Sequence, residues 1–237
     1  MLDSFKILEM EEDMARFTYV MSDIHGQFDA FMKMLDAIEF SDEDELYIVG
    51  DVIDRGPKSV ECIKWIMKQD NVLTLMGNHE LMLYDGYINN RPAYYDSLTK
   101  VRENMTEEEQ NNIMQWIEDM PESKIVTING KKFYLNHTQI ASAEYFEQEL
   151  TERMFPDYDR YLKYNDLTVK DIICIHGHIP TMEMRIWHHQ ERESSIWKNK
   201  SGTIIDVDCG AGYPDKGGKL GCLRLNDMRE FYVEIDF

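Results

Sequence analysis

Two carboxylates and one guanidinium lie within five positions in the segment Gly50-Asp51-Val52-Ile53-Asp54-Arg55-Gly56. The segment follows the apolar run Leu46-Tyr47-Ile48-Val49, which predicts a buried strand that ends in a glycine-rich turn. Such a cluster needs counter-ions, either protein cations in a salt-bridged loop or metal ions. Because a solvated acidic turn would look similar, the chemistry depends on the partners that the rest of the chain supplies.

Other short apolar runs end in side chains of the same kind. Asp23 and His25 follow the run 17–21, and residues i and i+2 of an extended segment point to the same side, so this pair suits one shared metal ion. The runs 72–76 and 171–175 also lead into amide or imidazole side chains. In chain order, the candidate site residues are Asp23, His25, Asp51, Asp54, Arg55, Asn78, His79, His137 and His178.

The elements that position these residues are expected to form parallel βαβ units. Apolar residues at helical spacing predict helices over 28–38 and 59–68, between the first three strands. A right-handed βαβ connection brings the carboxyl ends of its strands to one edge of the sheet, where open α/β sheets place their sites. We therefore expect Asp23, His25 and Asp51 to converge.

The second half of the chain predicts further strands. Asn129-Gly130, between the runs 125–128 and 131–136, is typical of a β-hairpin with a type I′ turn. Residues 142–155 indicate a weakly amphipathic helix. The remaining strands are expected over 171–175, 203–207, 219–225 and 231–235.

Residues 84–122 lack the strand pattern and predict a helical cap insertion beside the site. Thr106 and Glu109 have the spacing of a capping box, which starts a helix that Pro121 ends. No repeat or low-complexity linker marks a boundary, so we expect residues 1–237 to form a single domain.

The charge balance excludes some classes of partner. Lys and Arg number 25 and Asp and Glu 45, so the formal net charge is −20. A chain this acidic repels nucleic-acid backbones and anionic membranes, and we expect neither as a partner. The four scattered cysteines contain no Cys-x-x-Cys pair and the first 21 residues no long apolar core, which together favour a cytoplasmic protein with reduced thiols.

The ordered set Asp-x-His, Gly-Asp-x-x-Asp-Arg-Gly, Gly-Asn-His-Glu, a lone His and Gly-His resembles the phosphoprotein phosphatase family of the calcineurin-like metallophosphoesterases. The likeness covers nearly the whole chain, and the compact length is similar to the small bacterial and phage branch. It implies an α/β (α+β) fold, with two mixed sheets in a four-layer αββα sandwich and a small helical cap. It also implies a metal-dependent phosphomonoesterase, similar to Ser/Thr protein phosphatases, that acts on a phosphorylated protein or a small phosphoester.

The resemblance implies a site with two metal ions. A mixed shell of carboxylate, amide and imidazole ligands favours manganese, iron or zinc over calcium, and manganese is the expected ion. The implied ligands are Asp23 and His25 for the first ion, Asp51 as the bridge, and Asn78, His137 and His178 for the second.

The mechanism that the resemblance implies is attack of a metal-bound hydroxide on phosphorus, with both ions and Arg55 neutralising the phosphoryl oxygens. His79 would protonate the leaving alkoxide. Asp54 would accept a hydrogen bond from the other ring nitrogen of His79 and keep the imidazole cationic and oriented.

Members of this family carry a second phosphate-binding arginine between the lone His and the Gly-His. Arg153 and Arg160 both fall there, and Arg160 is preferred because its aromatic-flanked segment is more similar to that of relatives. Tyr213 lies in a glycine-rich turn that resembles the family's loop over the site, and it is a candidate substrate contact.

The sequence departs from the family pattern at Thr138-Gln139, where Ala-Gly is usual, and after Gly-Asn-His-Glu, where the usual Trp and paired glycines are missing. Substrate choice therefore stays open. A hydrolase of dinucleoside polyphosphates shares the same motifs, and a metal-bound adaptor that has lost catalysis is an alternative of another class. The filled motif positions disfavour the adaptor, and the net charge disfavours a nucleic-acid phosphodiesterase.

Overall fold

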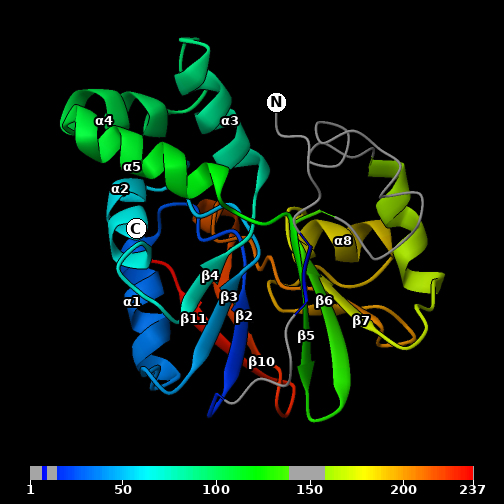
Figure 1. Cartoon of the computed structure of the whole chain (residues 1–237). Helices are drawn as coiled ribbons and strands as arrows, with labels where there is room; N and C mark the ends of the chain where they lie inside the picture. Colours follow the sequence, from blue (N-terminus) through cyan, green and yellow to red (C-terminus); the bar gives the residue numbers. More distant parts are fainter. Residues whose placement is uncertain (1–6, 10–14, 139–157, 237) are drawn as a thin grey trace.

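The computed structural model describes residues 7–9, 15–138 and 158–236. Two β-sheets pack face to face, and helices cover the outer face of each sheet (Figure 1). Helices α1 (Phe28–Ala37) and α2 (Ser59–Ile66) cover one sheet, and α8 (Thr181–Trp187) lies beyond the other. The chain thus has the α/β fold of the calcineurin-like metallophosphoesterases, with two mixed sheets, as the sequence predicted.

The five-stranded sheet has the order β11-β10-β2-β3-β4. The strands β2, β3 and β4 are parallel, whereas β10 pairs antiparallel with both β2 and β11. Their bounds are Thr18–Met21 for β2, Glu45–Ile48 for β3, Val72–Thr74 for β4, Lys219–Arg224 for β10 and Arg229–Glu234 for β11. The predicted βαβ units are therefore confirmed, and they bring the carboxyl ends of β2, β3 and β4 to one edge.

The six-stranded sheet has the order β1-β5-β6-β7-β9-β8. Asn129 (φ 52°) and Gly130 (φ 75°) connect β5 to β6, and two positive φ angles are the signature of the predicted type I′ turn. The strand bounds are Ile7–Glu9 for β1, Ser123–Ile128 for β5, Lys131–Asn136 for β6, Ile173–His176 for β7, Ile204–Asp206 for β9 and Trp197–Lys198 for β8.

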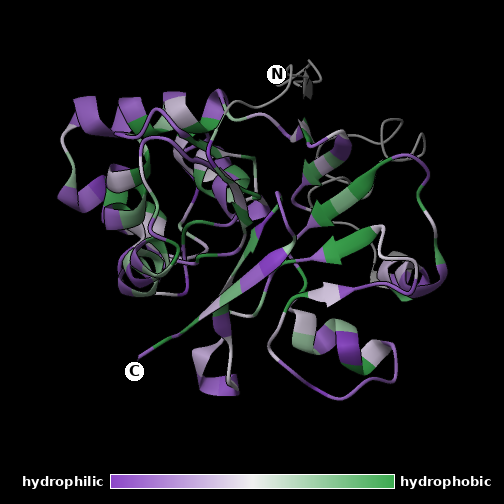
Figure 2. Cartoon of the chain, turned by 90° about the horizontal axis from the view of Figure 1, so that it is seen from below, coloured by the Kyte–Doolittle hydropathy of each residue, from purple (hydrophilic) through white to green (hydrophobic). Residues whose placement is uncertain are grey.

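Alternating side chains of the strands divide the core between the layers. Tyr19 and Met21 of β2 face the helices, whereas Val20 belongs to a second cluster with Phe133 and other residues of the opposite sheet. A third cluster packs the 3₁₀ helix η1 (Tyr158–Asp166) and α8 against the far side. Figure 2 shows several strands in hydrophobic colour and helices with much hydrophilic surface, as expected for sheets enclosed between amphipathic helices.

Three helices, α3 (Asn78–Ile88), α4 (Asp96–Asn104) and α5 (Glu107–Glu118), form a separate group above α2 in Figure 1. The predicted capping box is present, because the Glu109 N–H donates to Thr106 Oγ1 and the Thr106 N–H to Glu109 Oε2. The first helix begins already at Asn78, ahead of the predicted cap at 84–122, so one helix runs from the candidate site into the cap.

Some elements differ from the sequence prediction. Helix α8 was not predicted, because seven residues are too few for a periodic signal, and the short strands β1 and β8 were missed for the same reason. The predicted helix over 142–155 lies outside the described residues. Among the described helices, none is long and apolar enough to cross a membrane.

Phe133 on β6 is fully buried between the two sheets and offers a test of this packing. We expect Phe133→Ala to lower the free energy of unfolding by about 3–5 kcal/mol, because the substitution removes apolar burial and leaves a cavity. Urea unfolding measures the change. The matched control is Leu162→Ala at a side chain that is 48% exposed, with an expected change of about 0.5 kcal/mol or less; equal effects of the two variants would contradict the packing described.

Candidate metal centre and active site

The predicted site residues meet at the carboxyl ends of β2, β3, β4, β6 and β7, and several have a strained backbone. Six of them have positive φ although none is glycine, namely Asp23 (50°), His25 (49°), Asp51 (55°), Asp54 (69°), Arg55 (65°) and His178 (74°). Side chains with a Cβ rarely adopt this conformation, which costs of the order of 1–3 kcal/mol at each position. The fold therefore stabilises a costly backbone where the candidate ligands lie.

Glycines let the strand ends approach one another closely. A Cβ on Gly77 would lie 2.4 Å from the backbone nitrogen of Asp51, and a Cβ on Gly177 would lie 2.3 Å from Asp23 Oδ2. No larger residue fits at either position without displacing the neighbouring strand end. The glycines of the sequence motifs are thus required by the separation of the strand ends.

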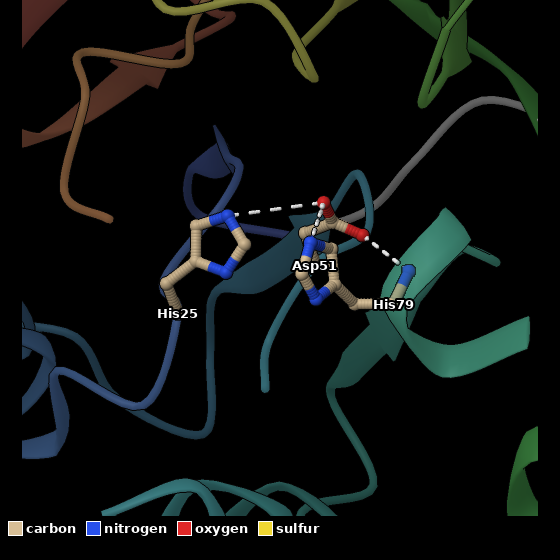
Figure 3. Close-up of side chains that lie close together, drawn as sticks. All are labelled: His25, Asp51 and His79. Atoms are coloured by element: carbon tan, nitrogen blue, oxygen red, sulfur yellow. Dashed lines mark hydrogen bonds and ion pairs between the residues drawn. The ribbon is translucent and has the colours of Figure 1, made fainter. Parts of the chain in front are cut away.

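In the first half of the site, buried side-chain atoms of Asp23, His25 and Asp51 converge. Figure 3 shows His25 and Asp51 beside His79. His25 Nε2 lies 3.7 Å from Asp23 Oδ1 and 3.8 Å from Asp51 Oδ2. His25 Nδ1 donates to the Ile53 carbonyl at 2.9 Å, which fixes the tautomer and leaves the Nε2 lone pair facing the carboxylates. Asp23 Oδ1 and His25 Nε2 are buried and have no hydrogen-bond partner within the described part of the chain, and a cation between them would satisfy both.

The second half of the site combines Asp51 with Asn78, His137 and His178. Asn78 Oδ1 lies 2.9 Å from both His137 Nε2 and His178 Nδ1, and His137 Nε2 lies 3.3 Å from Asp51 Oδ1. His137 Nδ1 donates to the Val49 carbonyl at 2.7 Å, so Nε2 is the nitrogen that faces Asn78 and Asp51. These residues fit a second cation that shares the Asp51 carboxylate with the first.

The pKa values of two histidines suit metal ligands. Burial lowers the pKa of His25 well below its usual value and that of His178 to about 3. Both imidazoles are therefore neutral at pH 7, the form that binds a metal ion. Burial alone would also lower the pKa of His137, but the Asp51 charge outweighs it and raises this pKa to about 10.

His79 has the surroundings that a proton donor needs. Its Nδ1 donates to Asp54 Oδ2 at 2.7 Å, and its Nε2 lies 3.8 Å from Asp51 Oδ2. Burial opposes the charged imidazole, but the Asp51 charge and the hydrogen bond to Asp54 outweigh it, so the pKa of His79 is raised. A ring nitrogen of His79 and ligand atoms of His25 and Asp51 all lie within 4.8 Å of one another, close enough to share one cation. On geometry alone, His79 can therefore either donate a proton or bind a cation.

Several residues that hold the site together were given no role from the sequence. Glu80 accepts hydrogen bonds from the backbone N–H groups of Asp51 at 2.9 Å and Val52 at 2.8 Å, and Ser22 donates to Asp23. The ring of Tyr95 lies 4.6 Å from that of His79, between centroids. Glu80 is the last residue of the Gly-Asn-His-Glu motif, which was a usable signal for its role, whereas no local pattern connects Tyr95 to the site.

A cavity of about 680 Å³ opens over these residues. Its volume is larger than a single phosphate group occupies. Arg55 and Lys216 line it, and the Tyr213 ring lies between them, 4.5 Å from the Arg55 guanidinium carbon and 4.8 Å from Lys216 Nζ. Arg55 and Tyr213, two of the predicted substrate contacts, thus both line the cavity, and their contact with a substrate stays a prediction. The structure adds a cation, Lys216, that the sequence analysis did not select.

The predicted second arginine is not tested. Arg160 lies in η1, but its side chain is outside what the structure describes, and Arg153 lies outside the described residues altogether. Thr138, where the sequence departs from the family pattern, is buried, and its N–H donates to Asn136 Oδ1 at 3.0 Å beside His137. This hydrogen bond stabilises the start of the turn after β6, where the family usually has a small residue instead of Thr138.

Several curated proteins of similar sequence carry the name symmetrical bis(5′-nucleosyl)-tetraphosphatase. The chain is 34% identical over 110 residues to the symmetrical bis(5′-nucleosyl)-tetraphosphatase of Actinobacillus succinogenes, a match that spans 44% of this chain and 38% of that protein. The match therefore covers less than half of the length of this curated relative.

Solved structures show the same fold. A protein described as a candidate diadenosine tetraphosphatase superposes with a TM-score of 0.71 at 14% identity, over 97% of this chain and 98% of that one. A protein serine/threonine phosphatase from Saccharomyces cerevisiae gives a TM-score of 0.65 at 16% identity, over 98% and 84%. Residues 18–211 match the family described as calcineurin-like phosphoesterase, and this chain belongs to that family.

Proposed function

We propose that this protein hydrolyses dinucleoside polyphosphates at a site with two metal ions. The observation that carries the proposal is the cavity of about 680 Å³ over the converging ligands, which has room for a nucleotide beside the reacting phosphate and is lined by tyrosine and tryptophan side chains. The similarity to a symmetrical bis(5′-nucleosyl)-tetraphosphatase supports the same substrate class. By analogy, the products would be nucleoside diphosphates.

This proposal reverses the order of the two functions expected from the sequence. The leading expectation was a phosphomonoesterase similar to Ser/Thr protein phosphatases, and the phosphoesterase class holds. The comparisons support the dinucleotide alternative better, because the curated relative carries that name, whereas the likeness to the yeast phosphatase is one of fold alone.

The proposed ligands are those that the sequence predicted. Asp23, His25 and Asp51 would hold one ion, and Asp51 would share the second with the three residues Asn78, His137 and His178. When bound, two divalent ions supply Lewis-acid charge and an activated water. Manganese, iron and zinc all accept this mixture of oxygen and nitrogen ligands.

The protein groups around the ions have separable proposed roles. Arg55 and Lys216 would neutralise phosphate oxygens of the substrate, since both are cations on the cavity wall. His79 would donate the proton from Nε2 to the leaving oxygen, because Asp54 occupies Nδ1 and keeps the imidazole charged.

The substrate class is tested by turnover of diadenosine tetraphosphate and of a phosphoserine peptide with added Mn²⁺. We expect a higher kcat/KM for the dinucleotide and adenosine diphosphate as its product, identified by chromatography. His79→Ala provides the inactive control. Faster hydrolysis of the peptide would reject the proposal, and full activity after chelation would reject the metal site.

The roles of two neighbouring carboxylates are tested by Asp51→Asn and Asp54→Asn. Asp51→Asn should lose bound metal as well as rate, because it removes the charge shared by both cation positions. Asp54→Asn should retain metal and lower kcat by about 10²–10⁴-fold, the usual contribution of a general acid. Metal content by elemental analysis and kcat are measured on the same preparations.

The matched control for both variants is Asp36→Asn, which removes one negative charge at an exposed position on α1. It should change neither metal content nor kcat. Loss of metal by Asp54→Asn, or equal behaviour of the two site variants, would contradict the division of roles within this loop.

A further inference from the structure

Tyr94 is the most exposed of the large apolar and aromatic side chains that the structure describes. Its side chain is 82% exposed, and it lies in the connection between α3 and α4. It nevertheless lines the cavity over the candidate metal centre, together with Tyr95. A large aromatic ring that contributes little to the core but faces a binding cavity is a feature of ligand stacking sites.

Three aromatic rings extend from the site outward. The ring centroids of His79 and Tyr95 lie 4.6 Å apart with an interplanar angle of 37°, and those of Tyr95 and Tyr94 lie 4.9 Å apart with an angle of 73°. Tyr94 is thus separated from the proposed proton donor by one intervening ring. Such offset and edge contacts are the favourable geometries for aromatic pairs.

The two tyrosines are attached to a fixed part of the site. Ser97, in the first turn of α4, accepts a hydrogen bond from the backbone N–H of Asp54 at 3.1 Å. Lys100, one turn later, donates to the Pro57 carbonyl at 3.1 Å. The start of α4 therefore keeps its position relative to the loop that orients His79.

The position of this ring pair defines which part of a substrate it would contact. In an in-line displacement the leaving group departs from the side of phosphorus opposite the nucleophile, and the proton donor lies on that same side. Because Tyr95 packs on His79 and Tyr94 on Tyr95, both tyrosines lie on the side of the leaving group.

We propose that Tyr94, supported by Tyr95, is a stacking platform for the base of the leaving nucleoside phosphate. This inference rests on the proposed function and assigns the substrate's nucleoside to a subsite. The base of a leaving nucleoside diphosphate is separated from the scissile bond by a ribose and two phosphates, and Tyr94 lies one ring beyond Tyr95, further from His79.

The platform is tested by the binding of two probes that differ only in the nucleoside, α,β-methylene adenosine diphosphate and methylenediphosphonate. Neither P–C–P linkage can be hydrolysed, and calorimetry with the Mn²⁺-loaded protein measures both affinities. We expect the nucleoside probe to bind more tightly to the wild type. Tyr94→Ala should weaken it by about tenfold, as expected for loss of one base–aromatic contact, and leave the base-free probe unchanged.

Two variants control for other effects of the substitution. Tyr94→Phe keeps the ring face and should bind the nucleoside probe as the wild type does. Ile88→Ala truncates another exposed side chain, which is 56% exposed at the end of α3. Ile88 is not among the residues that line the cavity, so this variant should change neither affinity.

The platform is rejected if the wild type binds the two probes equally well or if Tyr94→Ala leaves the nucleoside probe unaffected. An equal loss for both probes also rejects it, because the residue would then act on the phosphate site. These results do not depend on turnover. A protein that fails to hydrolyse diadenosine tetraphosphate but shows the Tyr94 effect overturns the proposed function and leaves the nucleoside subsite in place.

Discussion

The buried carboxylate of Asp51 is the group on which the rest of the site depends. Its Oδ1 accepts the backbone N–H of His79 at 3.0 Å and lies 3.3 Å from His137 Nε2, while Oδ2 lies 3.8 Å from both His25 and His79 Nε2. Burial opposes its ionisation, but the neighbouring charges of His137 and His79 outweigh burial and keep the pKa of this carboxyl well below its usual range. A permanently charged group at the junction of both ligand sets is what two cations require.

Holding Asp51 in this position requires a specific backbone, and Glu80 supplies much of the restraint. Its carboxylate accepts two consecutive backbone N–H groups of the Asp51 loop, and its own pKa is raised to about 7 by burial and by the Asp51 charge. Positive φ angles at Asp51, Asp54 and Arg55 add backbone strain to this loop. Strain of this kind persists only where the surrounding structure fixes the conformation, and it is concentrated here at the residues that chemistry needs.

Much of this arrangement could be predicted from local sequence patterns. The apolar run 17–21 predicts a buried strand, and the strand-end motifs identify the candidate ligands because a sheet edge brings successive strand ends together. What could not be predicted depends on contacts between distant segments. Lys216 lies in the short 3₁₀ helix η2 (Pro214–Lys216) and Tyr95 precedes α4, and none of the motifs recognised in the sequence includes either residue.

The missed residues share a location outside the two sheets. The sheets position the ligands through main-chain geometry that few substitutions can satisfy, whereas Tyr95 and Lys216 lie in connections where side chains face open space. The hydrogen bond from the Asp54 N–H to Ser97 joins these two parts, because it fixes the start of α4 to the loop that orients His79. Side chains of this connection can therefore vary while the hydrogen bond between His79, the proposed proton donor, and Asp54 is preserved.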